Sequence, residues 1–279
     1  MTCKNVESCF CNENVHNIIE KMGHGRFSDH YIGGLFDSPQ YRILEGQDCI
    51  QYLQEYVPFH LPQIQFVLEK VLWESEDFFN YTINILDLCS GPATVPLAFC
   101  KIPSIDYLRK YKITTVEASE DFDNMINTFK ATNINESVEI VNNLKYKLFD
   151  NNFMKDEAVF KAGYNWIIMA NSISAIGEGN TNKEVNEILN SFLSKVLCYS
   201  DKIILTIIET SLVKYFNFIN YLYNIESIGF RDLKIIRTVS PINFRLDVPK
   251  VLYCKFYKYG YSDHYTLHIN SKSLLLESK

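Results

Sequence analysis

The sequence has no long hydrophobic run, and its longest apolar segments, such as Ile203 to Ile208, have the length of a β-strand. A membrane helix needs roughly 18 consecutive apolar residues, so we expect no membrane span. The first residues also lack the basic stretch followed by an apolar stretch that a secretory signal shows. We therefore expect a cytoplasmic protein, in which the 8 cysteines are free thiols rather than disulfides.

An excess of positive charge is also lacking. Lys and Arg number 27 against 33 Asp and Glu, which gives a net charge of −6. This balance argues against broad binding of nucleic acid, although a local basic patch stays open. The hydrophobic share of 47% excludes a disordered chain. At about 150 residues per domain, the 279 residues allow one large domain or two small ones.

The paired cysteines of a zinc site are not present either. Cys3, Cys9 and Cys11 follow the spacing C-x5-C-x-C, whereas zinc sites usually show C-x2-4-C pairs. We expect no metal site here, and interpret the cysteines as reduced thiols in an exposed N-terminal tail. A metal or iron–sulfur centre is the alternative.

What the sequence does contain is an alternation of short apolar runs and helical apolar stripes. Strands are expected at 83–88, 113–116, 138–141, 166–169 and 203–208, and helical stripes at 47–80, 122–129, 185–196 and 212–223. Runs that are apolar on both sides belong to a parallel sheet between two layers of helices. Two final runs, 233–239 and 251–257, have no helical pattern between them. The sequence thus predicts an α/β fold, with a seven-stranded, mostly parallel sheet, helices on both faces and an antiparallel C-terminal strand pair.

The end of the first predicted strand and the turn after it contain the residues that indicate a ligand-binding site. The strand ends in Asp87, and Cys89-Ser90-Gly91-Pro92-Ala93 follows. Ligands of open α/β sheets bind at the carboxyl ends of strands, where a glycine permits close approach and a following helix offers free N–H groups. The second strand ends in Glu117, and a carboxylate there can accept hydrogen bonds from both hydroxyls of a ribose.

This arrangement resembles class I S-adenosylmethionine-dependent methyltransferases, whose first motif reads apolar-apolar-Asp-apolar-Gly-x-Gly-x-Gly. Asp87 and Gly91 match the motif, whereas Cys89 and Ala93 stand where the family commonly has glycine. The pair Gly229-Phe230 before the penultimate strand is also typical of the family. The resemblance implies a Rossmann-like S-adenosylmethionine-binding domain at 81–279, and we expect an N-terminal helical cap or lid at 1–80.

The resemblance also implies roles for individual residues. The cofactor-binding candidates are Asp87, Cys89, Ser90, Gly91, Glu117, Ala118, Asn142, Asn143, Asn171 and Ser172. In the family, the first acid orders the turn near the methionine end, the second acid holds the ribose, residues after strand three flank the adenine, and residues after strand four meet the acceptor. Each candidate also has an alternative interpretation without ligand binding. In that interpretation, Asp87 caps the following turn and Glu117 is a solvated strand end.

The segment from His24 to Gly34 is a candidate lid over the methyl acceptor, because glycines flank its His, Arg and Tyr side chains. The candidate catalytic residues are His24, His30 and Tyr31, and His60 is a further candidate base. Methyl transfer needs a positioned acceptor and, for a hydroxyl or an amine, a base that removes its proton. We expect the N-terminal 46 residues to serve the acceptor rather than the cofactor.

Several other functions find less support. A nicotinamide-dependent enzyme would need glycines where Cys89, Ala93 or Thr94 stand. After strand four, Asn171-Ser172-Ile173 lacks the Pro-Pro-aromatic sequence of amino-directed nucleic-acid methyltransferases, and the chain has no Pro-Cys pair of the kind cytosine-5 enzymes use. A small-molecule or peptide acceptor is therefore the main expectation.

Two alternatives stay open. One is a protein that binds S-adenosylmethionine without transferring methyl. The other is a ribosome- or RNA-directed enzyme, since Tyr52-Leu53-x-x-Tyr56-Val57-Pro58 and Ile208-Glu209-Thr210 are similar to the mitochondrial ribosomal small-subunit methyltransferase-like family.

Overall fold

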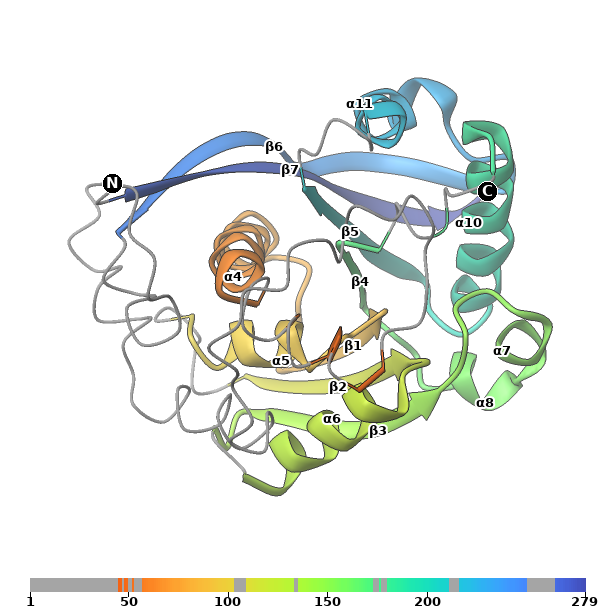
Figure 1. Cartoon of the computed structure of the whole chain (residues 1–279). Coiled ribbons are helices and arrows are strands. Elements are labelled where there is room, and N and C mark those ends of the chain that lie inside the picture. Colours follow the sequence, from red (N-terminus) through yellow and green to blue (C-terminus); the bar gives the residue numbers. More distant parts are fainter. Residues whose placement is uncertain are drawn as a thin grey trace.

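The structure is a computed structural model, shown in Figure 1. It describes residues 45–46, 48–49, 52, 57–102, 109–132, 135–172, 176, 180–210, 216–249 and 264–279. Within the described residues, no helix combines the length and the apolar character that crossing a membrane requires.

Helices and strands alternate along the chain, as the sequence predicts. The first half contains α4 (Val57–Glu74), β1 (Thr82–Leu88), α5 (Thr94–Phe99), β2 (Lys110–Glu117), α6 (Glu120–Thr132), β3 (Val138–Lys145), α7 (Asn151–Lys155) and α8 (Glu157–Phe160). The second half contains β4 (Trp166–Ala170), α10 (Asn182–Leu197), β5 (Lys202–Thr210), α11 (Phe216–Ile228), β6 (Leu233–Pro249) and β7 (His264–Ser278).

The strands form one 7-stranded sheet in the order β3-β2-β1-β4-β5-β7-β6. β1 pairs in parallel with β2 on one side and with β4 on the other, and β4 pairs in parallel with β5. β7 runs antiparallel to both β5 and β6. The chain order reverses between β1 and β4, which is where ligands bind in sheets of this kind. The predicted fold class is therefore confirmed.

Helices cover both faces of the sheet, because the strands are apolar on both sides. On one face, Ile83 and Ile85 of β1 pack in a cluster with α4, α5 and α6. On the other face, Leu86 and Leu88 belong to a cluster with α7, α8, α10 and α11. Because side chains alternate along a strand, Asp87 points to the face that α4 covers.

Local hydrogen bonds explain where two of the helices begin. Thr181 and Glu184 form a capping box at the start of α10, in which each side chain binds the main-chain N–H of the other residue. At the start of α6, the Ser119 hydroxyl accepts a hydrogen bond from the N–H of Phe122. These bonds satisfy donors that the first helical turn leaves without partners.

The C-terminal strand pair departs from the sequence prediction. The strand that pairs with β6 is β7, from His264 to Ser278, and the predicted strand at 251–257 lies outside the described residues. β6 and β7 pair from Leu233–Ser278 to Pro249–His264, whereas β5 pairs only with the part of β7 from Ile269 to Glu277. The two strands therefore continue beyond β5 as a two-stranded ribbon, which reaches past α4 in Figure 1.

Candidate functional site

The turn after β1 contains three left-handed residues at alternate positions. Cys89, Gly91 and Ala93 have φ values of 57°, 53° and 62°. Only glycine adopts this region without a steric cost. The chain thus keeps the backbone course of a Gly-x-Gly-x-Gly turn while it carries side chains at the first and third of these positions.

Ser90 ties this turn to the neighbouring strand. Its hydroxyl donates to the main-chain oxygen of Asp87 (2.9 Å) and accepts from the N–H of Val116 (3.2 Å). Its own N–H donates to the main-chain oxygen of Val116 at 3.1 Å. The Ser90 side chain is buried, so the residue holds the turn in place.

Glu117, at the end of β2, also binds the turn. One carboxylate oxygen accepts from the N–H of Gly91 at 2.8 Å, and the other accepts from the N–H groups of Ala118 and Ser119, both at 2.9 Å. Burial raises the pKa of Glu117, while these three N–H groups act in the opposite direction. Glu117 is therefore joined to the backbone of the turn.

Asp87 of β1 differs from Glu117 in that its carboxylate has no hydrogen-bond partner among the described residues. Its side chain is fully buried, and neither carboxylate oxygen accepts a hydrogen bond from the residues that the structure describes. Burial raises the pKa of Asp87 to about 8, and the charge of Glu117 raises it further. A buried carboxyl without a partner is costly, and such groups gather at functional sites.

Asp87 lies against a small cavity between α4 and the strand ends, which we call the strand-end recess. It has a volume of about 10 Å³, roughly the room that one water molecule needs. Its lining consists of Tyr52, His60, Ile64, Asp87, Cys89, Ser90, Thr94, Val95, Ala170 and Asn171. The recess thus joins the turn after β1 to the end of β4 and to a helix that precedes the sheet.

Tyr52 and His60 are the polar residues that come to the recess from before the sheet. The Tyr52 hydroxyl and His60 Nδ1 form a hydrogen bond of 3.0 Å. Burial lowers the pKa of His60 to about 4, so its imidazole is neutral at neutral pH. A Cβ atom built on Gly91 would lie 3.8 Å from the Tyr52 ring, so Tyr52 also lies beside the turn. The sequence singled out His60 as a candidate base, but no pattern in it indicated this position of Tyr52.

Asn171 and Ser172 follow β4, as predicted. Asn171 adopts a left-handed φ of 54°, and its N–H donates to the main-chain oxygen of Ile208 at 2.7 Å. The side-chain oxygens of Asn171 and Ser172 are buried, and neither has a hydrogen-bond partner among the described residues. Of the two residues, Asn171 lines the strand-end recess together with Asp87.

Asn142 and Asn143 differ from the prediction that they follow the third strand. Both lie inside β3, because main-chain pairing with β2 continues through Glu117 and Lys145. The Asn143 side chain accepts from the Thr115 hydroxyl at 2.9 Å and donates to Asp123 at 2.5 Å. Asn143 thus links β2, β3 and α6. Its role beside an adenine stays a prediction.

The candidate catalytic residues His24, His30 and Tyr31 lie outside the described residues, as do Cys3, Cys9 and Cys11. Their roles stay predictions from the sequence.

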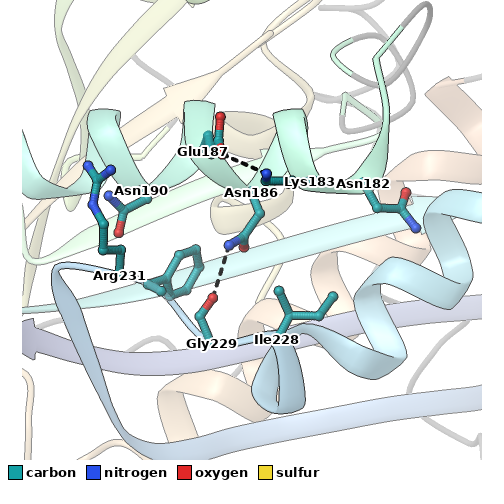
Figure 2. A pocket seen from close by; sticks show the side chains of 9 residues that line it. Asn182, Lys183, Asn186, Glu187, Asn190, Ile228, Gly229 and Arg231 are labelled. Carbon is teal, nitrogen blue, oxygen red and sulfur yellow. Dashed lines mark hydrogen bonds and ion pairs between the residues drawn. The ribbon is translucent and has the colours of Figure 1, made fainter.

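A larger cavity lies on the other face of the sheet, between α10 and the turn that joins α11 to β6 (Figure 2). We call it the α10–α11 hollow. Its volume is about 460 Å³, and it is lined by Asn182, Lys183, Asn186, Glu187, Asn190, Ile228, Gly229, Phe230 and Arg231.

The side chains of the α10–α11 hollow largely bind one another or the neighbouring backbone. Asn186 donates to the main-chain oxygen of Gly229 at 3.0 Å and accepts from the Tyr221 hydroxyl at 2.9 Å. Asn190 donates to the Asp232 carboxylate at 2.7 Å and accepts from its N–H at 3.0 Å. These asparagines hold α10 against the turn, so their hydrogen-bonding capacity is used within the fold.

No family model and no curated protein matches the sequence. Among solved structures, the chain is similar to the plantazolicin methyltransferase BpumL in complex with SAH, with 12% identity, 96% of this chain and 98% of that chain covered, and a TM-score of 0.43. It is also similar to a SAM-dependent methyltransferase from Archaeoglobus fulgidus, with 14% identity, coverage of 77% and 94%, and a TM-score of 0.36.

A third similar structure, from Listeria monocytogenes, is presented as a class I S-adenosylmethionine-dependent methyltransferase, with 10% identity and a TM-score of 0.40. The similarity covers 78% of this chain and 59% of that one, so the chain spans about three fifths of the Listeria protein's length. The descriptions of all three structures name methyltransferases.

Proposed function

We propose that the chain binds S-adenosylmethionine and transfers its methyl group to a small-molecule or peptide acceptor. The observation that carries the proposal is the pair of acids at neighbouring strand ends, of which Asp87 is fully buried and Glu117 partly buried. Glu117 fixes the backbone of the turn after β1 through Gly91, and Asp87 stands beside that turn with no partner among the described residues.

These residues suit the parts of the cofactor. A carboxylate offers about four acceptor positions, and backbone N–H groups use three of those on Glu117. A remaining position is available to a ribose hydroxyl. The left-handed turn at 89–93 keeps its backbone course next to Glu117, which lets a ligand lie against the main chain. The cofactor, when bound, supplies an electrophilic methyl group on a sulfonium.

The acceptor side of the proposal depends on the N-terminal segment. We assign the removal of the acceptor's proton to His24 or His30, and the positioning of the acceptor to Tyr31. Once an acceptor is found, His24→Ala or His30→Ala should lower kcat by at least about a hundredfold if that histidine is the base. The affinity for S-adenosylmethionine should stay unchanged.

Calorimetric titration of the full chain with S-adenosylmethionine and with S-adenosylhomocysteine tests the proposal. Saturable binding of either ligand at micromolar to millimolar concentration is the expected result. A folded protein that shows no response at millimolar ligand would overturn the proposal.

Glu117→Ala gives a sharper test of the same site. Hydrogen bonds to a charged group contribute about 1.5–3 kcal/mol each, so the loss of Glu117 should weaken cofactor binding at least about tenfold. Glu187→Ala is the matched control, because Glu187 is an exposed acid on α10 whose nearest cation is Lys183 at 4.0 Å. The control should bind like the wild type, and equal affinities of the Glu117 variant and the wild type would contradict the assignment.

A further inference from the structure

The outer surface of α10 has a depression on each side. Lys183, Glu187 and Ser191 are exposed and stand four residues apart, so they form a ridge along the helix. The α10–α11 hollow lies on one side of this ridge. On the other side lies a depression between α7 and α10 with a volume of about 400 Å³, which we call the α7–α10 groove. Glu187 lines both depressions, so the two form one continuous surface into which a ridge of another helix can pack.

The α7–α10 groove combines an apolar floor with acidic charge. Phe149, Met154 and Ile188 line it, and these side chains are partly buried against the core cluster of this face. The charged residues among its described lining are both acids, Glu184 and Glu187. The partner that fits the groove therefore presents an apolar side chain together with a positive charge.

Two lysines of α10 lie near the groove, and neither of them neutralises its acids well. The Lys195 ammonium donates to the main-chain oxygen of Met154 at 2.6 Å and lies 5.8 Å from the centre of the Phe160 ring. Lys183 and Glu187 are 4.0 Å apart and exposed, and a surface pair of this kind contributes little. Glu187 can therefore exchange this contact for a closer one with a cation of a partner.

The same face of the molecule offers such an apolar and basic group. The turn from α11 to β6 borders the α10–α11 hollow opposite α10 and contains Ile228 and Arg231 (Figure 2). Ile228 is 47% exposed. The Arg231 side chain is 80% exposed, and its ion pair with Asp232, at 3.0 Å, lies at the surface. We call this turn the Ile228–Arg231 corner, and its chemistry complements that of the α7–α10 groove.

We propose that two copies of this chain associate about a two-fold axis through their α10 faces, with the Ile228–Arg231 corner of each copy in the α7–α10 groove of the other. With the axis roughly along α10, each ridge lies in the α10–α11 hollow of the other copy, and each corner reaches past that copy's ridge into its groove. One arrangement thus fills both depressions of both copies, as an isologous contact requires. Arg231 of one copy then faces Glu184 and Glu187 of the other, and Ile228 covers the apolar floor.

The hydrogen bonds of this face favour a protein surface over a small ligand as the occupant. Asn186 and Asn190 already bind the turn from α11 to β6. Among the described residues that line the two depressions, none has a buried side-chain oxygen or nitrogen without a hydrogen-bond partner. The face also lies on the side of the sheet opposite α4, so the association leaves the proposed cofactor site of each copy free.

Sedimentation equilibrium of the full chain tests the inference. The wild type should convert reversibly from monomer to dimer between about 1 and 100 µM, the range of a weak specific interface. Arg231→Glu should weaken the association at least about tenfold, because it places like charges opposite each other. Ile228→Ala should weaken it about three- to tenfold, because the apolar floor is then less well covered.

Two exposed residues outside this face serve as matched controls. Arg237→Glu reverses the charge of an arginine that pairs with Asp77 at 3.1 Å, and Trp73→Ala removes a ring of α4 that is 79% exposed. Both controls should keep the wild-type dissociation constant. Combining Arg231→Glu with Glu187→Arg restores opposite charges across the interface, so the double variant should associate at least about threefold more tightly than Arg231→Glu alone.

The outcomes are distinct. A wild type that stays monomeric at about 100 µM would overturn the inference. So would a dimer whose dissociation constant is unchanged in folded Arg231→Glu and Ile228→Ala proteins, or one that the two controls weaken. If Arg231→Glu does not fold, Glu187→Arg takes its place, because it meets Arg231 of the other copy with a like charge. Calorimetry with S-adenosylhomocysteine measures the proposed function separately, and its result does not depend on the association.

Discussion

The strand-end recess and the α10–α11 hollow lie on opposite faces of the sheet and differ in both size and chemistry. The α10–α11 hollow has a volume of about 460 Å³ and the strand-end recess about 10 Å³. Asn186 and Asn190 in the hollow bind the neighbouring turn, whereas Asp87 in the recess has no partner among the described residues. The asparagine side chains of the hollow thus already form hydrogen bonds within the fold, whereas the Asp87 carboxylate of the recess is left for a ligand to bind. Unsatisfied buried groups, more than volume, therefore indicate where a ligand belongs.

Asp87→Asn should produce the largest change in stability. Burial raises the pKa of Asp87 from 3.8 to about 8, so the stability that this group contributes at low pH is lost as pH rises through about 8. The amide does not titrate. We expect its free energy of unfolding to exceed that of the wild type by on the order of 3 kcal/mol at about pH 8.5, and by less at about pH 5. Urea unfolding at both pH values measures the difference, and parallel pH dependences would contradict the burial argument.

Asn190→Ala, in the α10–α11 hollow, should destabilise the protein. The Asn190 side chain is buried and makes two hydrogen bonds with Asp232. Its loss should lower the free energy of unfolding by about 2 kcal/mol without a change in affinity for S-adenosylhomocysteine. Asn224→Ala is the control, because Asn224 is exposed on α11 and its side chain donates to the main-chain oxygen of Asn220, within its own helix. A loss of ligand affinity in Asn190→Ala would mean that the two regions are coupled.

Cys89→Gly should stabilise the protein by about 1 kcal/mol, because glycine removes the cost of a left-handed backbone. Ala93→Gly should gain less, since its methyl group is buried and burial of a methyl group contributes about 0.8 kcal/mol. Gly91→Ala, at φ 53°, should lower stability. Thermal unfolding compares the three variants, and a loss of stability in Cys89→Gly would show that the thiol's contacts outweigh the backbone cost.

Lys183→Ala should have the smallest effect. Lys183 and Glu187 form an exposed i,i+4 pair at 4.0 Å on α10, as Figure 2 shows. Such surface pairs contribute at most about 0.5 kcal/mol, so denaturant midpoints of the variant and the wild type should nearly coincide. A large loss would indicate that the hollow depends on this lysine in a way that its contacts do not explain.

The sheet could be predicted from the sequence because its strands are short, apolar on both sides and separated by helical stripes. Asp87 and Glu117 stood out for the same reason, as acids that end apolar runs. Asn142 and Asn143 were also candidates, but their place inside β3 could not be predicted, because their pairing with β2 depends on main-chain hydrogen bonds and on a register shift at Ile113/Thr114. Side-chain pattern carries no information on such a shift.

Tertiary contacts could not be predicted from the sequence either. His60 and Tyr52 meet through the way α4 packs on the sheet, and the hydrogen bond between them is not implied by their spacing. The partner strand of β6 was also misplaced, because the polar Asn270-Ser271-Lys272-Ser273 stretch of β7 hides a strand whose later residues, such as Leu274, are apolar.

The ribbon that β6 and β7 form beyond β5 has a consequence for the dynamics of the chain. Among the described residues, β7 pairs with β6 alone from His264 to His268, whereas from Ile269 to Glu277 it lies between β5 and β6. A two-stranded ribbon is marginally stable by itself, and local opening needs less free energy where fewer neighbours must separate. Amide hydrogens of β7 should therefore exchange with solvent deuterium rapidly near His264 and slowly near Leu275, along a gradient that runs through a single strand.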